Sequence, residues 1–241
     1  MSNNYFQFKQ FRIEQARCAQ KVSTDACLLG AAADLAGATR VLDIGTGTGL
    51  LALMAAQRAL EAQIEAVELD PDAAAQAAAN VAASPWPGRI RVHSQSLADY
   101  AATQPAPFSH LLCNPPFFQR SLLPPETTRA AARHAGAASL TFAEIVAFAA
   151  HFLAPLGRLA VLLPPPEMTQ FEHEAKSVGL TVRSRLAVRH RPGGRLTRCI
   201  QEFGRGAAEP VLERELLVEA LDGTGYSEEF RRLLAPFYLH L

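Results

Sequence analysis

The sequence predicts an α/β fold with a mostly parallel central sheet and an antiparallel pair of strands at its edge. Short apolar runs, typical of buried strands, alternate with longer segments of helical pattern up to residue 163. Strands joined by helices run parallel, and the helices then cover both faces of the sheet. Beyond residue 179, two longer strand-like segments follow one another across a glycine turn, which indicates an antiparallel pair.

The first 23 residues alternate loosely between aromatic and basic side chains, which indicates short strands or an arm. Thr24 and Asp25 can cap a helix that reaches about Leu35. Pro71 lies where the first turn of a helix accepts proline. Buried strands are expected at residues 40–44, 64–68, 90–92, 109–113 and 158–163. Helices are expected at residues 50–58, 71–83 and 141–153, and the last is expected to end at Pro155-Leu156-Gly157.

The second half of the chain begins with a long loop, expected at residues 114–138. Two strands, 180–189 and 196–203, flank the turn Arg191-Pro192-Gly193-Gly194. The segment after them ends in a helix at 228–234 and is expected to pack on the sheet edge. Because no linker or repeat interrupts the chain, one domain is predicted over residues 1–241. It consists of an N-terminal arm and helix (1–38), a sheet core (39–205) and a C-terminal extension (206–241).

The composition is that of an ordinary globular protein. The chain has 241 residues, of which 49% are apolar and 19% charged, and its formal net charge is zero. A global basic field is therefore absent, and any nucleic-acid binding must come from a local patch. The four cysteines and seven histidines show no metal-ligand spacing, so no metal site is predicted. Neither a signal peptide nor a membrane span is recognised, and a cytoplasmic monomer is expected.

A glycine loop, Val41-Leu-Asp43-Ile-Gly45-Thr46-Gly47-Thr-Gly49, follows a predicted strand and opens a predicted helix. Glycines allow the backbone to turn tightly and to approach a ligand closely. The carboxylate of Asp43 argues against a diphosphate ligand and suits a ligand with an ammonium group. At the end of the next strand, Glu68 can accept hydrogen bonds from both hydroxyls of a ribose. On the glycines alone, a nucleotide-binding fold for a dinucleotide fits nearly as well.

The segment Asn114-Pro115-Pro116-Phe117 follows the apolar run that ends at Cys113. Two prolines make the loop stiff and remove backbone donors. The Asn114 side-chain oxygen and the Pro115 carbonyl are then two acceptors, and Phe117 adds a flat apolar face. These groups can hold a planar molecule that carries an NH2 group. Cys113 itself is interpreted as a buried residue at a strand end rather than as a nucleophile.

Residues 41–49 together with Glu68 resemble the S-adenosylmethionine loop of class I methyltransferases, which have a Rossmann-like sheet. Residues 114–117 resemble the NPP[YF] motif of the members that methylate an exocyclic or amide nitrogen. Segments near both ends of the chain (Phe11 to Gly30 and Leu221 to Leu241) are similar to bacterial tRNA1(Val) adenine-N6 methyltransferases. The resemblance therefore spans nearly the whole chain and implies S-adenosylmethionine as cofactor and tRNA as partner.

The resemblance also implies residue roles at the cofactor. The loop backbone would hold the amino-acid end, with Asp43 near its ammonium group. Glu68 would bind the ribose, and Leu69 would pack on the adenine. The predicted cofactor-binding residues are Lys21, Thr24, Asp25, Asp43, Gly45, Thr46, Gly47, Gly49, Glu68, Leu69, Ser96 and Leu97. Ser96 stands where many relatives carry an aspartate for the adenine amine, and a serine accepts such a bond more weakly.

At the target, the resemblance assigns catalysis to Asn114, Pro115, Pro116 and Phe117. The first two would hold both N–H groups of an adenine amine, and Phe117 would stack on the base. An anticodon loop is where a base is most easily unstacked. Phosphate contacts are predicted for arginines in the long loop and around the edge turn: Arg120, Arg129, Arg133, Arg189, Arg191, Arg195 and Arg198. For any one of them, a solvated surface role is the alternative.

Other functions remain open from the sequence. The main alternative is a glutamine-N5 methyltransferase acting on release factors, which shares the NPP-aromatic chemistry. Against it, only about forty residues precede the cofactor loop, too few for the helical domain usual in that group. Methylation of DNA or ribosomal RNA also fits the motif, but the architecture is short for either. A non-catalytic cofactor-binding subunit is the remaining class, and the intact motifs disfavour it.

Overall fold

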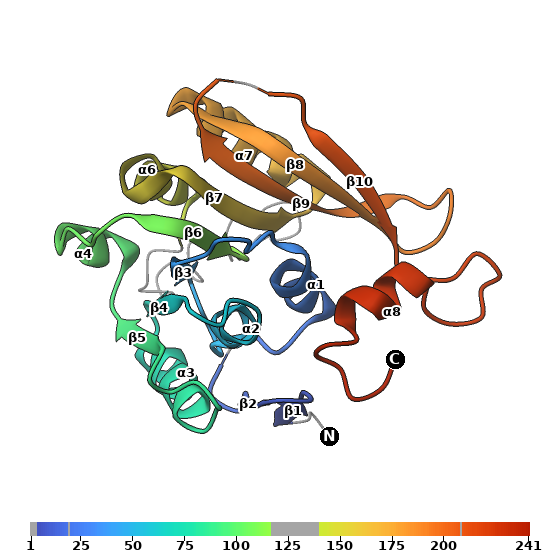
Figure 1. Ribbon diagram of the computed structural model, residues 1–241, viewed down its shortest axis with the longest axis horizontal. Helices are drawn as coiled ribbons and strands as arrows, with labels where there is room; N and C mark the ends of the chain where they lie inside the picture. The colour runs from blue at the N-terminus through green and yellow to red at the C-terminus, as the bar shows by residue number, and fades with distance from the viewer. Residues whose placement is uncertain (1–3, 19, 117–139, 208) are drawn as a thin grey trace, which may run out of the picture.

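The computed structural model describes residues 4–18, 20–116, 140–207 and 209–241. Its centre is an eight-stranded sheet flanked by helices on both faces (Figure 1). In spatial order the strands are β10 (Leu212–Leu217), β8 (Leu180–Arg189), β9 (Leu196–Arg205), β7 (Leu153–Leu163), β6 (Phe108–Cys113), β3 (Arg40–Ile44), β4 (Gln63–Glu68) and β5 (Ile90–Ser94). Strands β3 to β7 are mutually parallel, whereas β9 runs antiparallel to both of its neighbours. The mostly parallel sheet and the antiparallel pair β8–β9 are confirmed.

Two apolar clusters, one on each face of the sheet, form the core. The first face is covered by α1 (Thr24–Ala32), α2 (Leu50–Arg58), α3 (Pro71–Ala82) and α8 (Glu228–Leu234). The second face is covered by α4 (Leu97–Ala102), α6 (Phe142–Phe152) and α7 (Pro165–Ser177). Burying both faces explains why the central strands read as continuous apolar runs rather than alternating ones.

The two ends of the chain meet beside the first face. A hairpin of β1 (Tyr5–Gln7) and β2 (Arg12–Glu14) precedes α1, as the expected arm allows. Phe8 pairs with Tyr238 in an isolated bridge, and the Lys9 Nζ donates to the Ala235 carbonyl at 2.6 Å. Figure 1 shows β1 and the segment that follows α8 on the same side of the molecule. The C-terminal extension therefore packs against the N-terminal arm as well as against the sheet edge.

Helix α6 ends at Phe152, close to the predicted end at Leu153, but the prediction that Pro155-Leu156-Gly157 separates it from a strand beginning at 158 is wrong. Strand β7 begins at Leu153, directly after α6, and contains these residues. The β6–β7 register shifts between Phe108 and His110, so the extra residues form a bulge, where proline is tolerated. A Cβ at Gly157 would lie 2.9 Å from the Ser109 carbonyl oxygen, so the close approach of the two backbones requires glycine there.

Three elements were not predicted. Helix α7 begins at Pro164-Pro165-Pro166, which occupy its N-cap and first turn, where no N–H is needed. Strand β10 lies outside β8 at the sheet edge, and its exposed charged residues mask the strand pattern. Helix α4 has only six residues. By contrast, the bounds predicted for β3, α2 and α8 match the structure.

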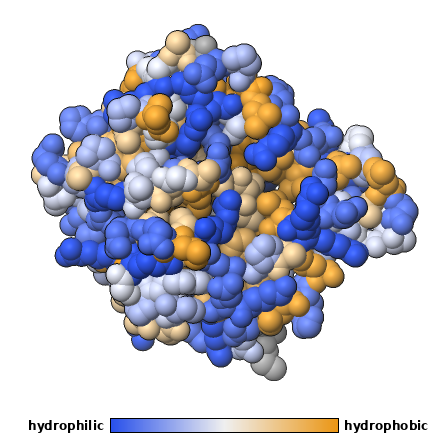
Figure 2. All heavy atoms as spheres, viewed as in Figure 1, coloured by the Kyte–Doolittle hydropathy of each residue, from blue (hydrophilic) through white to orange (hydrophobic). Residues whose placement is uncertain are grey.

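No helix within the described ranges is both long and apolar enough to cross a membrane. On the face seen in Figure 2, hydrophobic and hydrophilic surface are interspersed. The exposed large apolar side chains are scattered along the chain; examples are Leu60, Leu156 and Leu221. Single exposed apolar residues of this kind are normal for a globular surface.

Candidate active site

The glycine loop, Glu68 and Asn114 lie side by side at the carboxyl edge of the sheet. Ile44, the last residue of β3, is in register with Val67 of β4 and with Cys113 of β6. After β3 the chain continues to β4, which lies on one side of β3. Strand β6 pairs with β3 on its other side, so the order of the strands reverses at β3. Such a switch point is where open α/β sheets bind ligands. The fold thus brings together the two motifs that the sequence separates by about 65 residues.

The glycine loop has the backbone that the sequence predicts. Gly45, Gly47 and Gly49 all have positive φ, at 69°, 55° and 84°. A Cβ at Gly49 would also lie 3.4 Å from the Cβ of Ala77 on α3, so glycine is needed there for both reasons. The N–H groups of Gly45 and Thr46 both donate to the Val67 carbonyl, at 2.9 and 3.1 Å. The loop is therefore tied to the end of β4.

The Glu68 carboxylate is oriented by backbone donors. The Gly47 N–H donates to its Oε2 at 2.8 Å, and the Asp70 N–H donates to its Oε1 at 3.0 Å. Each carboxylate oxygen can accept more than one hydrogen bond, so both keep capacity for hydroxyl donors. Leu69 follows with 40% of its surface exposed, an apolar side chain beside the carboxylate. This arrangement fits a ribose with an adjoining base.

Asp43 lies fully buried beneath the glycine loop. Its Oδ2 accepts hydrogen bonds from the Thr46 hydroxyl and, at 3.1 Å, from the Ala52 N–H in α2. Its Oδ1 has no hydrogen-bond partner among the described residues. Burial raises the pKa of Asp43 to about 7, although the Thr46 and Ala52 bonds act in the opposite direction. An unsatisfied buried carboxylate oxygen fits a site that receives a cation.

We expect Asp43→Asn to remove a pH-dependent loss of stability. The folded chain holds the Asp43 proton to about pH 7, whereas the unfolded chain releases it near the ordinary pKa of 3.8. The stabilising effect of the proton is therefore complete below the unfolded pKa and is lost as the pH rises through about 7. Urea titrations at several pH values measure the free energy of unfolding of both proteins. The difference between Asp43→Asn and wild type should change in favour of the variant up to about pH 7 and stay constant above it. A gap that widens against the variant with rising pH would contradict this.

Asn114 and Pro115 border a cavity of about 300 Å³. The Asn114 Oδ1 is buried and has no hydrogen-bond partner within the described part of the chain. An unpaired buried amide oxygen is costly, so its presence at a cavity wall indicates that a ligand donor satisfies it. The remaining cavity lining consists of Gln20, Lys21, Ser23, Asp25 and Pro116.

Of the three predicted N-terminal site residues, two line the cavity and one does not. Lys21 and Asp25, which the sequence assigns to the cofactor, line the cavity that Asn114 borders. Thr24 is not among the lining residues, and its side chain forms a hydrogen bond with Tyr238 near the C-terminus. The N-terminus of α1 is capped by Ser23, whose hydroxyl accepts a hydrogen bond from the Ala26 N–H at 3.2 Å.

Ser96 sits at the N-cap of α4, and Leu97 follows it into the core. The Ser96 hydroxyl accepts the Asp99 N–H at 3.0 Å and donates to the Asp99 Oδ2 at 2.6 Å. One lone pair of the Ser96 oxygen is still available for an amine donor. Asp99, which sequence reasoning missed, thus places a carboxylate behind the serine. The spacing Ser-x-x-Asp before an apolar run could have indicated this cap.

Four predicted site residues, Phe117, Arg120, Arg129 and Arg133, lie outside the described residues. Arg191 and Arg195 belong to the exposed turn between β8 and β9. Because Leu163 at the end of β7 is in register with Cys199, this turn projects from the same edge as Asn114. In the ranges that the structure describes, neither arginine forms an ion pair, whereas Arg189 pairs with Glu215 and Arg198 with Asp25.

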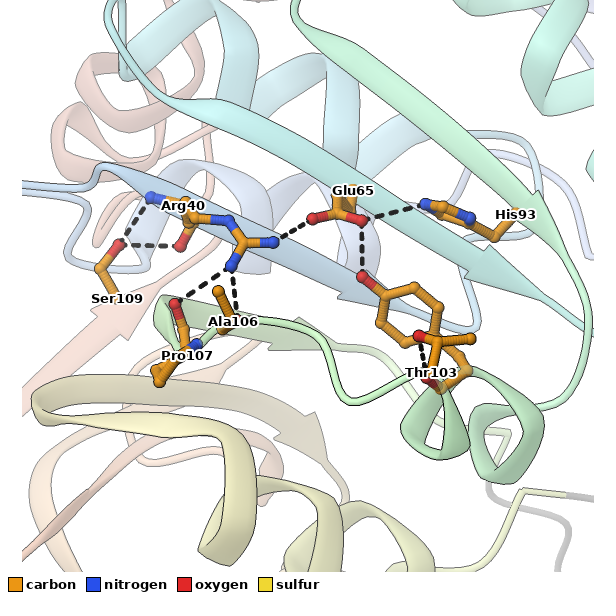
Figure 3. Close-up of polar contacts among 8 residues, drawn as sticks. Arg40, Glu65, His93, Thr103, Ala106, Pro107 and Ser109 are labelled. Carbon is orange, nitrogen blue, oxygen red and sulfur yellow. Dashed lines mark hydrogen bonds and ion pairs between the residues drawn. The ribbon is translucent and has the colours of Figure 1, made fainter.

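A polar network beneath the site was not predicted (Figure 3). The Glu65 carboxylate accepts hydrogen bonds from Arg40 and from the Tyr100 hydroxyl, and lies 3.0 Å from the His93 Nε2. Burial alone would raise the pKa of Glu65, but the Tyr100 and Arg40 bonds outweigh it and the pKa is lowered. Because Tyr100 lies on α4, the network fixes that helix, and with it Ser96, to the sheet.

Cys113 is fully buried, and burial raises the pKa of its thiol well above the ordinary value. A buried thiol with a raised pKa is a poor nucleophile, which agrees with the packing role expected for it. Among the residues placed in the structure, no three histidine, cysteine, aspartate or glutamate side chains gather as ligands for a metal ion.

A glycine loop, an oriented carboxylate and an Asn-Pro-Pro segment are thus gathered at one switch point of a Rossmann-like sheet. This fold and this site define an S-adenosylmethionine-dependent methyltransferase, and the family model of the Methyltransferase small domain matches residues 18–165. A tRNA1(Val) (adenine(37)-N6)-methyltransferase of Dyadobacter fermentans is 39% identical over 98% of both chains. One from Bacteroides thetaiotaomicron is 42% identical over 100% of both chains. The chain belongs to this family of tRNA methyltransferases.

Solved structures share the fold at low sequence identity. A predicted O-methyltransferase from Agrobacterium tumefaciens has a TM-score of 0.64 and 21% identity, covering 88% of this chain and 96% of that one. A ribosomal protein L11 methylase from Lactobacillus delbrueckii has a TM-score of 0.56 and 15% identity, covering 81% of this chain and 84% of that one. These matches confirm the Rossmann-like methyltransferase fold.

Proposed function

We propose that this chain methylates the exocyclic N6 of adenine 37 in tRNA1(Val), beside the anticodon, with S-adenosylmethionine as methyl donor. The observation that carries the proposal is the buried Asn114 Oδ1, which borders a cavity and has no hydrogen-bond partner among the described residues. Relatives of this name align with nearly the whole chain, which supports the choice of substrate.

The target chemistry rests on Asn114 and Pro115. An adenine amine is a poor nucleophile because its lone pair is delocalised into the ring. Two acceptors, the Asn114 Oδ1 and the Pro115 carbonyl, hold both N–H groups and favour a pyramidal nitrogen with a localised lone pair. Positioning and fixed dipoles therefore supply the catalysis, and no covalent enzyme intermediate is needed. The base stacks on Phe117 in this proposal.

The cofactor is held by the residues of the glycine loop and of the neighbouring strand ends. When bound, S-adenosylmethionine supplies a methyl group activated by a sulfonium. The loop backbone and Asp43 bind its amino-acid end, and Glu68 accepts the ribose hydroxyls. The Ser96 hydroxyl, which is hydrogen-bonded to Asp99, accepts a hydrogen bond from the adenine amine of the cofactor. Leu69 and Leu97 pack against the adenine ring.

The tRNA is bound at the carboxyl edge by the basic turn between β8 and β9. Arg191 and Arg195 are exposed and lie at the edge that carries Asn114. Such cations bind phosphates beside an unstacked base. Arg120, Arg129 and Arg133, which lie outside the described residues, are proposed to add further phosphate contacts.

We expect the double variant Arg191→Ala/Arg195→Ala to weaken tRNA binding and to reduce its salt dependence. Removing one arginine that binds a phosphate should lower the slope of log affinity against log salt by about 0.7 to 1. Filter binding at several salt concentrations measures both quantities. The matched control removes two exposed arginines elsewhere, Arg91 on β5 and Arg232 on α8. Equal slopes for the wild type and the double variant would refute the phosphate contacts.

Substrate class is tested by offering alternatives to the same preparation. Labelled S-adenosylmethionine is supplied with unmodified tRNA, ribosomal RNA, DNA or release factor, and products are digested and identified by mass spectrometry. N6-methyladenosine from tRNA supports the proposal. Methylglutamine from release factor would replace it with the main alternative.

Three further properties belong to this proposal. The chain acts as a single domain with the subdivisions 1–38, 39–205 and 206–241, supported by the one sheet that carries both apolar clusters. It acts as a monomer, which sedimentation at assay concentration would test. It works in the cytoplasm, where tRNA is modified.

A further inference from the structure

We propose that Arg198 is a positioning residue for methyl transfer, which holds Asp25 in place as a wall of the target cavity. The inference rests on the proposed function of that cavity. Arg198 lies on β9 and Asp25 in the first turn of α1, and 173 residues separate them in sequence. The sequence suggests Asp25 as a cofactor residue and Arg198 only as one of several candidate phosphate contacts.

The contact between the two side chains has the geometry of a strong ion pair. The Arg198 Nε lies 2.6 Å from the Asp25 Oδ2. The Arg198 Nη1 also donates to the Thr197 carbonyl at 2.7 Å, which fixes the plane of the guanidinium. Only 28% of the arginine side chain and 29% of the aspartate side chain are exposed. A pair this sheltered is screened less by salt than a surface pair.

Asp25 belongs to the wall that faces Asn114. Both residues line the cavity of about 300 Å³, together with Lys21 and Pro115. Asp25 is the second residue of α1, where a carboxylate also suits the positive end of the helix. A carboxylate that swung into the cavity would compete with Asn114 for the N–H groups of the target amine. The Arg198 contact prevents that movement.

Arg198 is itself anchored by its surroundings. It is in register with Val188 on β8 and stands three residues beyond Arg195 in the basic turn. The Arg189 Nη1 donates to the Gly194 carbonyl at 2.7 Å and braces the same turn. The ion pair therefore joins the proposed phosphate-binding turn to the wall of the target cavity. Because its guanidinium is engaged with Asp25, Arg198 is distinguished from Arg191 and Arg195, which form no ion pair among the described residues.

The test compares Arg198→Gln with the matched control Arg185→Gln. Arg185 lies on β8, has a side chain 31% exposed, and pairs with Glu172 and Glu213 away from the cavity. We expect Arg198→Gln to lower kcat on tRNA by about tenfold or more, with little change in the KM for tRNA, because misplacement acts on the reacting geometry. Arg198→Lys should recover part of the rate, since an ammonium still contacts the carboxylate. The control should keep the wild-type kcat.

Two further readouts separate this role from others. In the protein alone, amide hydrogen exchange of Ala26 and Cys27, which bond to Ser23 in the first turn of α1, should speed up in Arg198→Gln and not in the control. The effects of Asp25→Asn and Arg198→Gln on kcat should not add in the double variant.

The outcomes that overturn the inference are distinct. A raised KM for tRNA and a smaller salt slope with unchanged kcat would make Arg198 a phosphate contact instead. Equal losses in Arg198→Gln and Arg185→Gln, tracking their melting temperatures, would reduce it to a stability effect. If the wild type itself does not methylate tRNA, the proposed function fails, while unchanged amide exchange in the variant would refute the positioning role independently.

Discussion

Replacing Asn114 by alanine is expected to lower turnover on tRNA by about two to three orders of magnitude. The substitution removes an acceptor whose contact with the amine strengthens as the nitrogen becomes pyramidal, so the loss appears in kcat. The Asn114 Oδ1 has no partner in the described parts of the fold, so its removal should not reduce stability. Single-turnover rates with saturating tRNA measure the effect.

Cofactor binding is the control for this result. Calorimetric titration with S-adenosylmethionine should give nearly the same affinity for wild type and Asn114→Ala, because Glu68 and the glycine loop hold the cofactor. Asn114→Asp, which keeps an acceptor oxygen at the same place, should lose less activity than the alanine variant. A large drop in cofactor affinity would place Asn114 in the cofactor site and not at the target.

Glu68→Ala is expected to weaken cofactor affinity by about a hundredfold. Two hydrogen bonds from ribose hydroxyls to a carboxylate contribute about 3 kcal/mol together, which corresponds to that factor. The variant also removes the acceptor for the Gly47 N–H, which loosens the loop. Calorimetry measures the affinity directly, and thermal shift in the presence of cofactor provides an independent value.

The matched variant for Glu68 is Glu61→Ala, an exposed glutamate in the turn before β4. It should bind cofactor like the wild type. Glu68→Gln should fall between wild type and Glu68→Ala, because the amide keeps one acceptor oxygen. Unchanged affinity in Glu68→Ala would show that the ribose is bound elsewhere.

The sequence was sufficient to predict parts of the site in which one short segment determines both the backbone conformation and the reactive or binding groups. The glycines at 45, 47 and 49 indicate positive φ, and Asn114 with two prolines indicates a stiff row of acceptors. The alternation of apolar strands and helices also predicts that β3, β4 and β6 end at one edge. The central part of the site therefore follows from local pattern and topology.

Prolines explain two of the errors in the predicted elements. Proline is a helix breaker in an interior but a good starter in a first turn, so Pro164-Pro165-Pro166 conceal the beginning of α7. Pro155 suggests a helix end, whereas it lies in the bulge of β7. At Pro155 the outcome is decided by the partner strand β6, which is remote in sequence.

Side-chain partners that are distant in sequence could not be predicted. The Arg198–Asp25 pair spans 173 residues, and Glu65 collects Arg40, His93 and Tyr100 from three different elements. Charged residues of this kind resemble surface positions in a sequence, because burial depends on the packed sheet. Asp99 is different, since its partner Ser96 lies only three residues away.

The most direct test of the proposed function is to locate the methyl group on tRNA. Unmodified tRNA1(Val) is incubated with the protein and S-adenosylmethionine and is then cleaved with a base-specific ribonuclease. The masses of the fragments are determined by mass spectrometry. We predict that only the anticodon-loop fragment gains one methyl group, that digestion of this fragment yields N6-methyladenosine, and that a tRNA with guanine at position 37 gains none. Methylation elsewhere, or none in a preparation that binds the cofactor, would contradict the proposed function.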